Sequence, residues 1–111
     1  MPPKPKAVRY NQHTYALFRS YVPKVPIPEV NLYGFLKSIG LEHEHSKFKS
    51  FRQLVEIRFT PYSTNVLKTM GMDVKDRKRL IRHLEVYRRG LMPRHYAYYH
   101  RMTPETDPDN L

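Results

Sequence analysis

The apolar residues of this chain repeat at helical spacing only between residues 30 and 91, and this short window limits the fold. The clearest helix places four of them on one stripe, at positions i, i+3, i+4 and i+7: Leu32, Phe35, Leu36 and Ile39. Asn31 predicts its N-cap, and Gly40 predicts its left-handed C-terminal stop. A domain of this size buries roughly 60% of the surface that its unfolded chain exposes. Such a small core leaves little room for an enclosed catalytic cleft.

Four further helices are expected in the same window. The first is a short turn around residues 44–48. Residues that favour helix N-termini precede the other three: Ser50, Thr60 with Pro61, and Asp73. Their inward faces are expected to carry Phe51, Leu54, Val55, Val66, Leu67, Met70, Leu80, Ile81, Leu84, Tyr87 and Leu91. Gly71 and Gly90 mark helix ends. No segment shows a strand pattern, so the sequence predicts an all-α fold, a small four- to five-helix bundle with extended N- and C-terminal tails.

Composition divides the chain into three parts. Residues 1–29 form a proline-rich basic arm, residues 30–91 the helical domain, and residues 92–111 a tail that is first aromatic and basic, then acidic. The arm is poor in acids, which is typical of a mitochondrial presequence, but its prolines would disrupt an amphipathic helix. Whether it is cleaved stays open. We expect it to order on a partner.

The chain is strongly basic, with 20 Lys and Arg residues against 10 Asp and Glu residues and a formal net charge of +10. This charge favours association with polyanions. Cysteine is absent, which excludes disulfides and thiolate metal sites. No apolar run approaches the roughly 20 residues that span a bilayer, so no membrane partner is expected.

The last helix should carry one basic face opposite its apolar face. At about 100° per residue, Lys75, Lys78, Arg79, Arg82 and Arg89 gather there. Arginine and lysine in such a row neutralise phosphates, although a solvated face is the simpler alternative. Because only Asp76 and Glu85 interrupt the run, the sequence favours RNA contact. Further RNA-contact candidates lie in the tail and the arm: Arg94, Arg101, Arg9 and Arg19.

Aromatic and basic residues also alternate in residues 94–101. Such residues stack on unpaired bases, or they anchor a tail in a protein groove, and both interpretations stay open. His43 and His45 have no cysteine nearby, so a polar loop is expected there rather than a metal site. No arrangement of nucleophile and base and no glycine-rich phosphate loop is visible, so neither an enzyme nor a cofactor is expected.

Two segments resemble the IGR-motif family. Residues 32–40 read LYGFLKSIG, similar to that family's opening "FL..IG" helix, and residues 67–90 contain LKTMGM, DRKRLI and YRRG, similar to its later pattern. The matching residues are Phe35, Leu36, Ile39, Gly40, Leu67, Gly71, Arg77, Ile81, Arg88 and Gly90. Leu41 stands where the motif has its arginine, and its effect is open. Helical angles place Arg77 and Arg88 near the apolar face, so we expect them to hold the fold.

The resemblance implies a fold similar to the sterile alpha motif and a structural role in the small subunit of the mitochondrial ribosome. The expected partners are small-subunit rRNA and neighbouring mitochondrial ribosomal proteins, in the mitochondrial matrix. No small-molecule substrate and no homo-oligomer are expected. The alternative is a sterile-alpha-motif-like adaptor that binds proteins or RNA hairpins outside the ribosome. The sequence leaves open which rRNA helix or proteins are contacted, and whether the chain is a constitutive subunit or an assembly factor.

Overall fold

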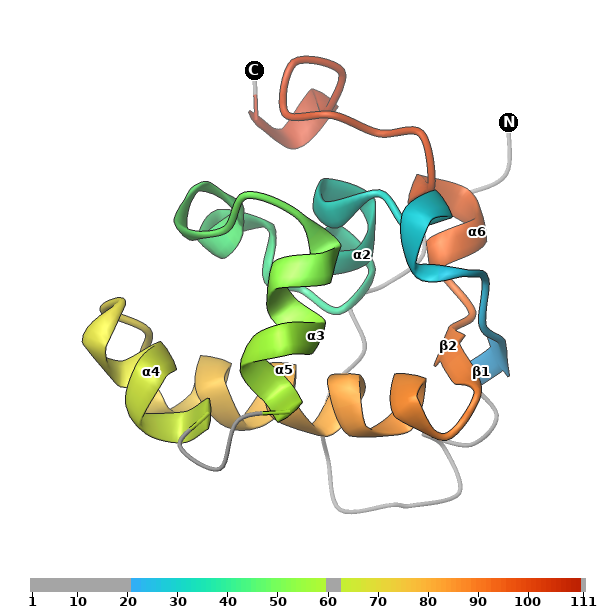
Figure 1. Cartoon of the computed structure of the whole chain (residues 1–111). Coiled ribbons are helices and arrows are strands. Elements are labelled where there is room, and N and C mark those ends of the chain that lie inside the picture. The colour runs from blue at the N-terminus through green and yellow to red at the C-terminus, as the bar shows by residue number, and fades with distance from the viewer. Residues whose placement is uncertain (1–20, 60–62, 111) are drawn as a thin grey trace.

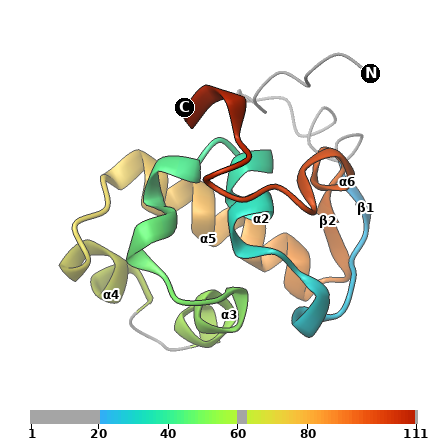
Figure 2. The same ribbon diagram turned by 90° about the horizontal axis from the view of Figure 1, so that it is seen from above.

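The longest helix, α5 (Val74–Arg88), forms one edge of the molecule, and the other elements pack along it and above it (Figure 1). The structure, a computed structural model, describes residues 21–59 and 63–110. The remaining helices are α2 (Leu32–Ser38), α3 (Phe51–Phe59), α4 (Ser63–Thr69) and α6 (Tyr96–Tyr99). Three short 3-10 helices are η1 (Ile27–Glu29), η2 (Glu42–Lys47) and η3 (Pro108–Asn110). Seen from above, α3 and α4 lie on one side of the molecule and α2 and α6 on the other (Figure 2). The predicted all-α class, a small helical bundle, is confirmed.

The helix boundaries follow from local chemistry. Gly40 and Gly71 end α2 and α4 with positive φ angles of 79° and 88°, as the sequence predicted. The Ser50 hydroxyl accepts a hydrogen bond from the Gln53 backbone N–H at 3.3 Å and caps α3. Asp73 holds the N-cap position of α5, but its side chain makes no capping hydrogen bond. The predicted start of α4 at Thr60 and Pro61 lies outside the described residues.

The core lies where α2, α3 and α5 meet. Phe35, Leu36, Ile39, Leu54 and Leu80 are fully buried, as their helical spacing predicted. Edge-to-face ring contacts join Phe35 to Phe51 at 4.8 Å and Phe51 to Tyr87 at 4.9 Å. Leu41, in the position of the motif arginine, is also fully buried. An apolar side chain therefore suits this position better than a charged one.

Two strands differ from the expectation of a purely helical chain. β1 (Tyr21–Pro23) and β2 (Leu91–Pro93) pair antiparallel, with Tyr21 opposite Pro93. Leu91, expected on the last helix, instead opens β2, because α5 ends at Arg88 and Gly90 turns the chain at φ 99°. This pairing brings the end of the arm against the residues that follow α5.

The expectation of an extended C-terminal tail is wrong for residues 92–110. These residues form β2, α6 and η3 and return over α2. Gly34 lets the end of α6 approach, because a β-carbon at residue 34 would collide with the carbonyl oxygen of Tyr99. Asn31 holds the N-cap position of α2 as predicted, but its side chain makes no capping hydrogen bond and donates through Nδ2 to the carbonyl oxygens of Met102 at 2.6 Å and His100 at 3.2 Å. The segment is thus part of the folded body.

A polar cluster, here called the clasp, holds the C-terminal segment on α2. Its residues are Tyr33, Lys37, Asp107 and Asp109. The Lys37 ammonium lies 2.9 Å from Asp107 Oδ2 and 3.0 Å from Asp109 Oδ2, and the Tyr33 hydroxyl donates to Asp107. Asp107 is fully buried. Burial, and then the hydrogen bond to Asp107, raise the pKa of Tyr33 well above its usual value.

Candidate nucleic-acid interface

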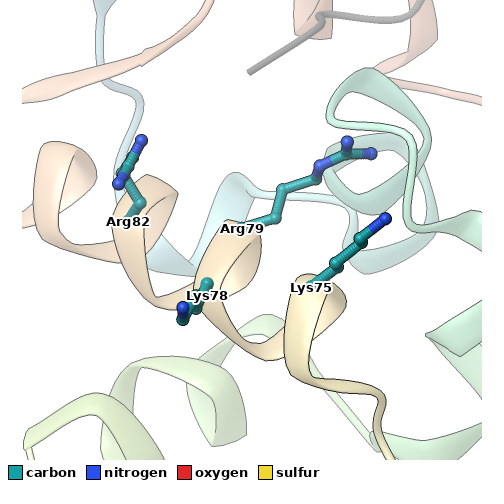
Figure 3. A pocket seen from close by; sticks show the side chains of 4 residues that line it. All are labelled: Lys75, Lys78, Arg79 and Arg82. Carbon is teal, nitrogen blue, oxygen red and sulfur yellow. The ribbon is translucent and has the colours of Figure 1, made fainter. Parts of the chain in front are cut away.

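The basic face predicted on α5 exists and lines a concave surface, here called the basic hollow. Its described lining consists of Lys75, Lys78, Arg79 and Arg82, and its volume is about 440 Å³ (Figure 3). These residues stand at i, i+3, i+4 and i+7, so one helix face presents all of them. Lys75, Lys78 and Arg82 are exposed, and Arg79 is half-buried.

The rest of α5 explains why the row faces outward. Leu80, Leu84 and Tyr87 are buried in the core on the opposite side of the helix. The two acids of α5 contact other elements: Asp76 Oδ2 lies 2.9 Å from His43 Nε2 on η2, and Glu85 pairs with Arg58 on α3. Both carboxylates therefore have partners outside the hollow. No acid lines the hollow among the described residues.

His83, which lies on the same helix, adds no charge to the hollow near neutral pH. It is almost fully buried, and burial lowers the pKa of its imidazole to about 3. Its Nδ1 atom lies 3.2 Å from the Tyr21 hydroxyl. Burial raises the pKa of Tyr21 to about 12, and the positive charge of Arg82 opposes that increase. Among the described residues, the charge facing the hollow therefore comes from lysine and arginine.

None of the other RNA-contact candidates that the structure describes lines the hollow. Arg89 is exposed and lies 3.9 Å from Glu85 Oε1. Arg94 and Arg101 are exposed on the C-terminal segment. Arg9 and Arg19 lie outside the described residues. Of the seven candidates that lie in the described ranges, the structure thus gathers four into one surface.

The two arginines expected to hold the fold differ from each other. Arg77 donates through Nη1 to the Met72 carbonyl oxygen at 2.8 Å and ties α5 to the turn before it. Arg88 has a side chain that is 58% exposed, and its Nη1 lies 4.0 Å from Glu85 Oε1. Arg77 has the contact that a structural role requires, whereas Arg88 faces the surface.

The aromatic residues after β2 are anchored within their own chain. Tyr96 and Tyr99 are buried. The Tyr96 hydroxyl accepts from the Asn31 N–H at 2.8 Å and donates to the Glu29 carbonyl oxygen at 3.3 Å. Both alternatives left open for this segment concern a partner, whereas the structure buries these two rings against residues of their own chain.

His43, Glu44 and Asp76 have ligand-type atoms within 4.8 Å of one another. The Lys47 ammonium lies 2.8 Å from Glu44 Oε2 and already compensates this carboxylate. His45 is turned away, with Nδ1 2.9 Å from the Glu42 carbonyl oxygen. We therefore assign no metal to this cluster.

Sequence reasoning missed the clasp. Tyr33 and Lys37 stand at i and i+4 on α2, and this pairing was the available signal. Their partners Asp107 and Asp109 are about 70 residues away, so no local pattern connects them.

No helix within the described ranges is long and apolar enough to cross a membrane.

The comparison with protein families gives one match. The model described as the small ribosomal subunit protein mS41 SAM domain matches residues 20–90. No curated protein and no solved structure matches the chain significantly. The match is to the sterile alpha motif domain, and the IGR motif stays a prediction. Since residues 20–90 are well over half of the chain, the chain belongs to the mS41 family of small-subunit proteins of the mitochondrial ribosome.

Proposed function

We propose that this chain is a structural protein of the mitochondrial small subunit that binds the phosphate backbone of rRNA through the basic hollow. It would act in the matrix, without catalysis or a cofactor, and contact neighbouring ribosomal proteins through other surfaces. The observation that supports this proposal is the row of basic side chains on one face of α5, which are Lys75, Lys78, Arg79 and Arg82.

The chemistry of the hollow suits phosphate better than bases. Lysine and arginine neutralise phosphate charge and release counterions, and such contacts position a protein without reading sequence. No aromatic side chain lines the hollow in the part of the chain that the structure describes. Stacking on unpaired bases needs such a side chain. The hollow therefore suits the phosphate backbone of RNA rather than its bases.

The alternative function is a free adaptor, which the sterile alpha motif domain of the family favours. An adaptor that polymerises needs an acidic surface to meet the basic one. Several acids of the described residues pair within the chain: Asp107 with Lys37, Glu44 with Lys47, and Glu85 with Arg58. This internal pairing leaves few acids for such a surface and favours RNA as the polyanion.

The test is reversal of charge in the hollow. The double variant Arg79→Glu/Arg82→Glu should lose co-sedimentation with the small subunit in a gradient of mitochondrial lysate, while its circular dichroism spectrum stays helical. The matched control is Lys49→Glu/Arg52→Glu, which makes the same charge change at exposed positions outside the hollow. It should still sediment with the subunit. If the Arg79→Glu/Arg82→Glu variant sediments with the subunit as well, the hollow is not the rRNA surface.

A further inference from the structure

A second concave surface lies on the other side of α5. It is here called the apolar notch. Its described lining consists of Lys24, Ile27, Val55, Arg58, Leu84, Tyr87 and Arg88, and its volume is about 110 Å³. A cavity of roughly 150 Å³ holds benzene, so the notch has room for one aliphatic side chain.

The floor of the notch is apolar and preformed. Ile27 from η1, Val55 from α3 and Leu84 from α5 supply it. The Tyr87 hydroxyl donates to the Val25 carbonyl oxygen at 2.5 Å, and the Lys24 N–H donates to the Gly90 carbonyl oxygen at 3.0 Å. These bonds fix the wall that comes from the arm, so a ligand would not have to order it.

The rim of the notch is cationic. Lys24 places its ammonium 4.9 Å from the centre of the Tyr87 ring, and Arg58 and Arg88 stand on the side of α3 and α5. Glu85 compensates part of this charge through its pair with Arg58, but the lining includes no acid among the residues described. The notch thus combines an apolar seat with a positive rim.

We propose that the apolar notch binds an acidic segment of a neighbouring protein, which inserts one aliphatic side chain between its Asp or Glu residues. Protein interfaces bind through such anchors, an apolar side chain in a small pocket surrounded by polar contacts. Complementary charge at the rim adds orientation and speeds association. An RNA strand would satisfy the rim but leave the apolar floor unused. This inference rests on the proposed contacts with neighbouring proteins in the subunit. Because the C-terminal segment packs on its own chain, other surfaces are left to make those contacts.

The first test uses the absence of native cysteine. Val55→Cys in the full chain places a single thiol in the notch, and Asn65→Cys, exposed on α4, is the matched control. In the assembled subunit, alkylation of the notch thiol by N-ethylmaleimide should be at least about tenfold slower than in the free chain. When Lys24→Glu and Arg88→Glu are added to the Val55→Cys variant, the rim no longer attracts the acidic segment. The notch thiol in the assembled subunit should then be alkylated about tenfold faster than in Val55→Cys alone. Equal alkylation of the notch thiol in the free chain and in the subunit overturns the proposal.

The second test identifies the occupant. A zero-length carbodiimide joins an ammonium to a carboxylate that it contacts, so Lys24 should crosslink to an Asp or Glu of another protein with an aliphatic residue within about three positions. Exposed Lys68 on α4 is the control. If ribonuclease restores the reactivity of the notch thiol and Lys24 gives no crosslink, RNA occupies the notch and the proposal is overturned. A chain that sediments with the subunit while its notch thiol stays as reactive as in the free chain contradicts this inference alone. An Arg79→Glu/Arg82→Glu variant that still sediments with the subunit contradicts only the proposed rRNA contact.

Discussion

The basic hollow and the clasp both contain lysine, but they place it in opposite surroundings. In the hollow, Lys75 and Lys78 are exposed, and no carboxylate lines the surface among the described residues. In the clasp, the side chain of Lys37 is 4% exposed and lies within 3.0 Å of two carboxylates. A lysine in water contributes little to stability but is available to a partner, whereas a buried lysine is bound to its neighbours. The surroundings of a cation, more than its identity, therefore divide stability from binding in this chain.

The sharpest test of this comparison is Lys37→Met beside Lys75→Met. Loss of Lys37 leaves Asp107 buried without its cation, and removing one partner of a buried pair costs about 3–5 kcal/mol of unfolding free energy. Lys75→Met should change the unfolding free energy by less than about 0.5 kcal/mol. Urea unfolding followed by circular dichroism measures both. Equal midpoints for the two variants would show that the clasp adds no stability.

The second prediction concerns the pH dependence of stability and depends on buried His83, which lies on the same helix as the basic hollow. The pKa of His83 is about 3 in the folded chain and near its usual 6.5 in the unfolded chain, so the unfolded state binds the extra proton first. The contribution of neutral His83 to stability is complete above pH 6.5 and is lost as the pH falls toward 3. The slope should be about 1.4 kcal/mol per pH unit.

Urea midpoints measured between about pH 7 and about pH 4 check this expectation. The control is His83→Gln, which removes the titrating group and should flatten the dependence, even though the variant is less stable at neutral pH. If the wild-type and His83→Gln slopes agree, other groups cause the acid loss.

Helical periodicity predicted most of the fold, because each helix buries one continuous stripe. Phe35, Leu54 and Leu80 are core residues as their spacing required. The strands were not predicted because each is only three residues long and ends in a proline, so neither shows an alternation that a pattern could reveal. The packing of the C-terminal segment was not predicted for a different reason. The positions of Tyr96 and Asp107 depend on partners on or just before α2, and such long-range pairs leave no trace in local sequence.

The candidate site was predictable to the same extent. The stripe of α5 followed from its helical angle, since charge on one side and apolar residues on the other define a face. Which cations join the stripe depends on tertiary structure: Arg94 and Arg101 have the same charge but lie on a segment that turns toward α2. The apolar notch draws residues from η1, α3 and α5, so it exists only after these elements pack.

The smallest expected effect refines the hollow itself. For RNA binding, the logarithm of affinity falls with the logarithm of salt concentration, with a slope near −0.9 per neutralised phosphate. Lys78→Ala should reduce the magnitude of this slope by about 1 and weaken binding uniformly across RNA sequences, with little change in unfolding free energy. Binding of the full chain to duplex RNA at several salt concentrations measures it, with Lys68→Ala on α4 as the control. A slope that does not change in Lys78→Ala would mean that Lys78 faces solvent rather than phosphate, and the hollow would then shrink to the cations that remain. The comparison with the clasp would survive that outcome, because Lys37 is defined by its buried partners and not by RNA.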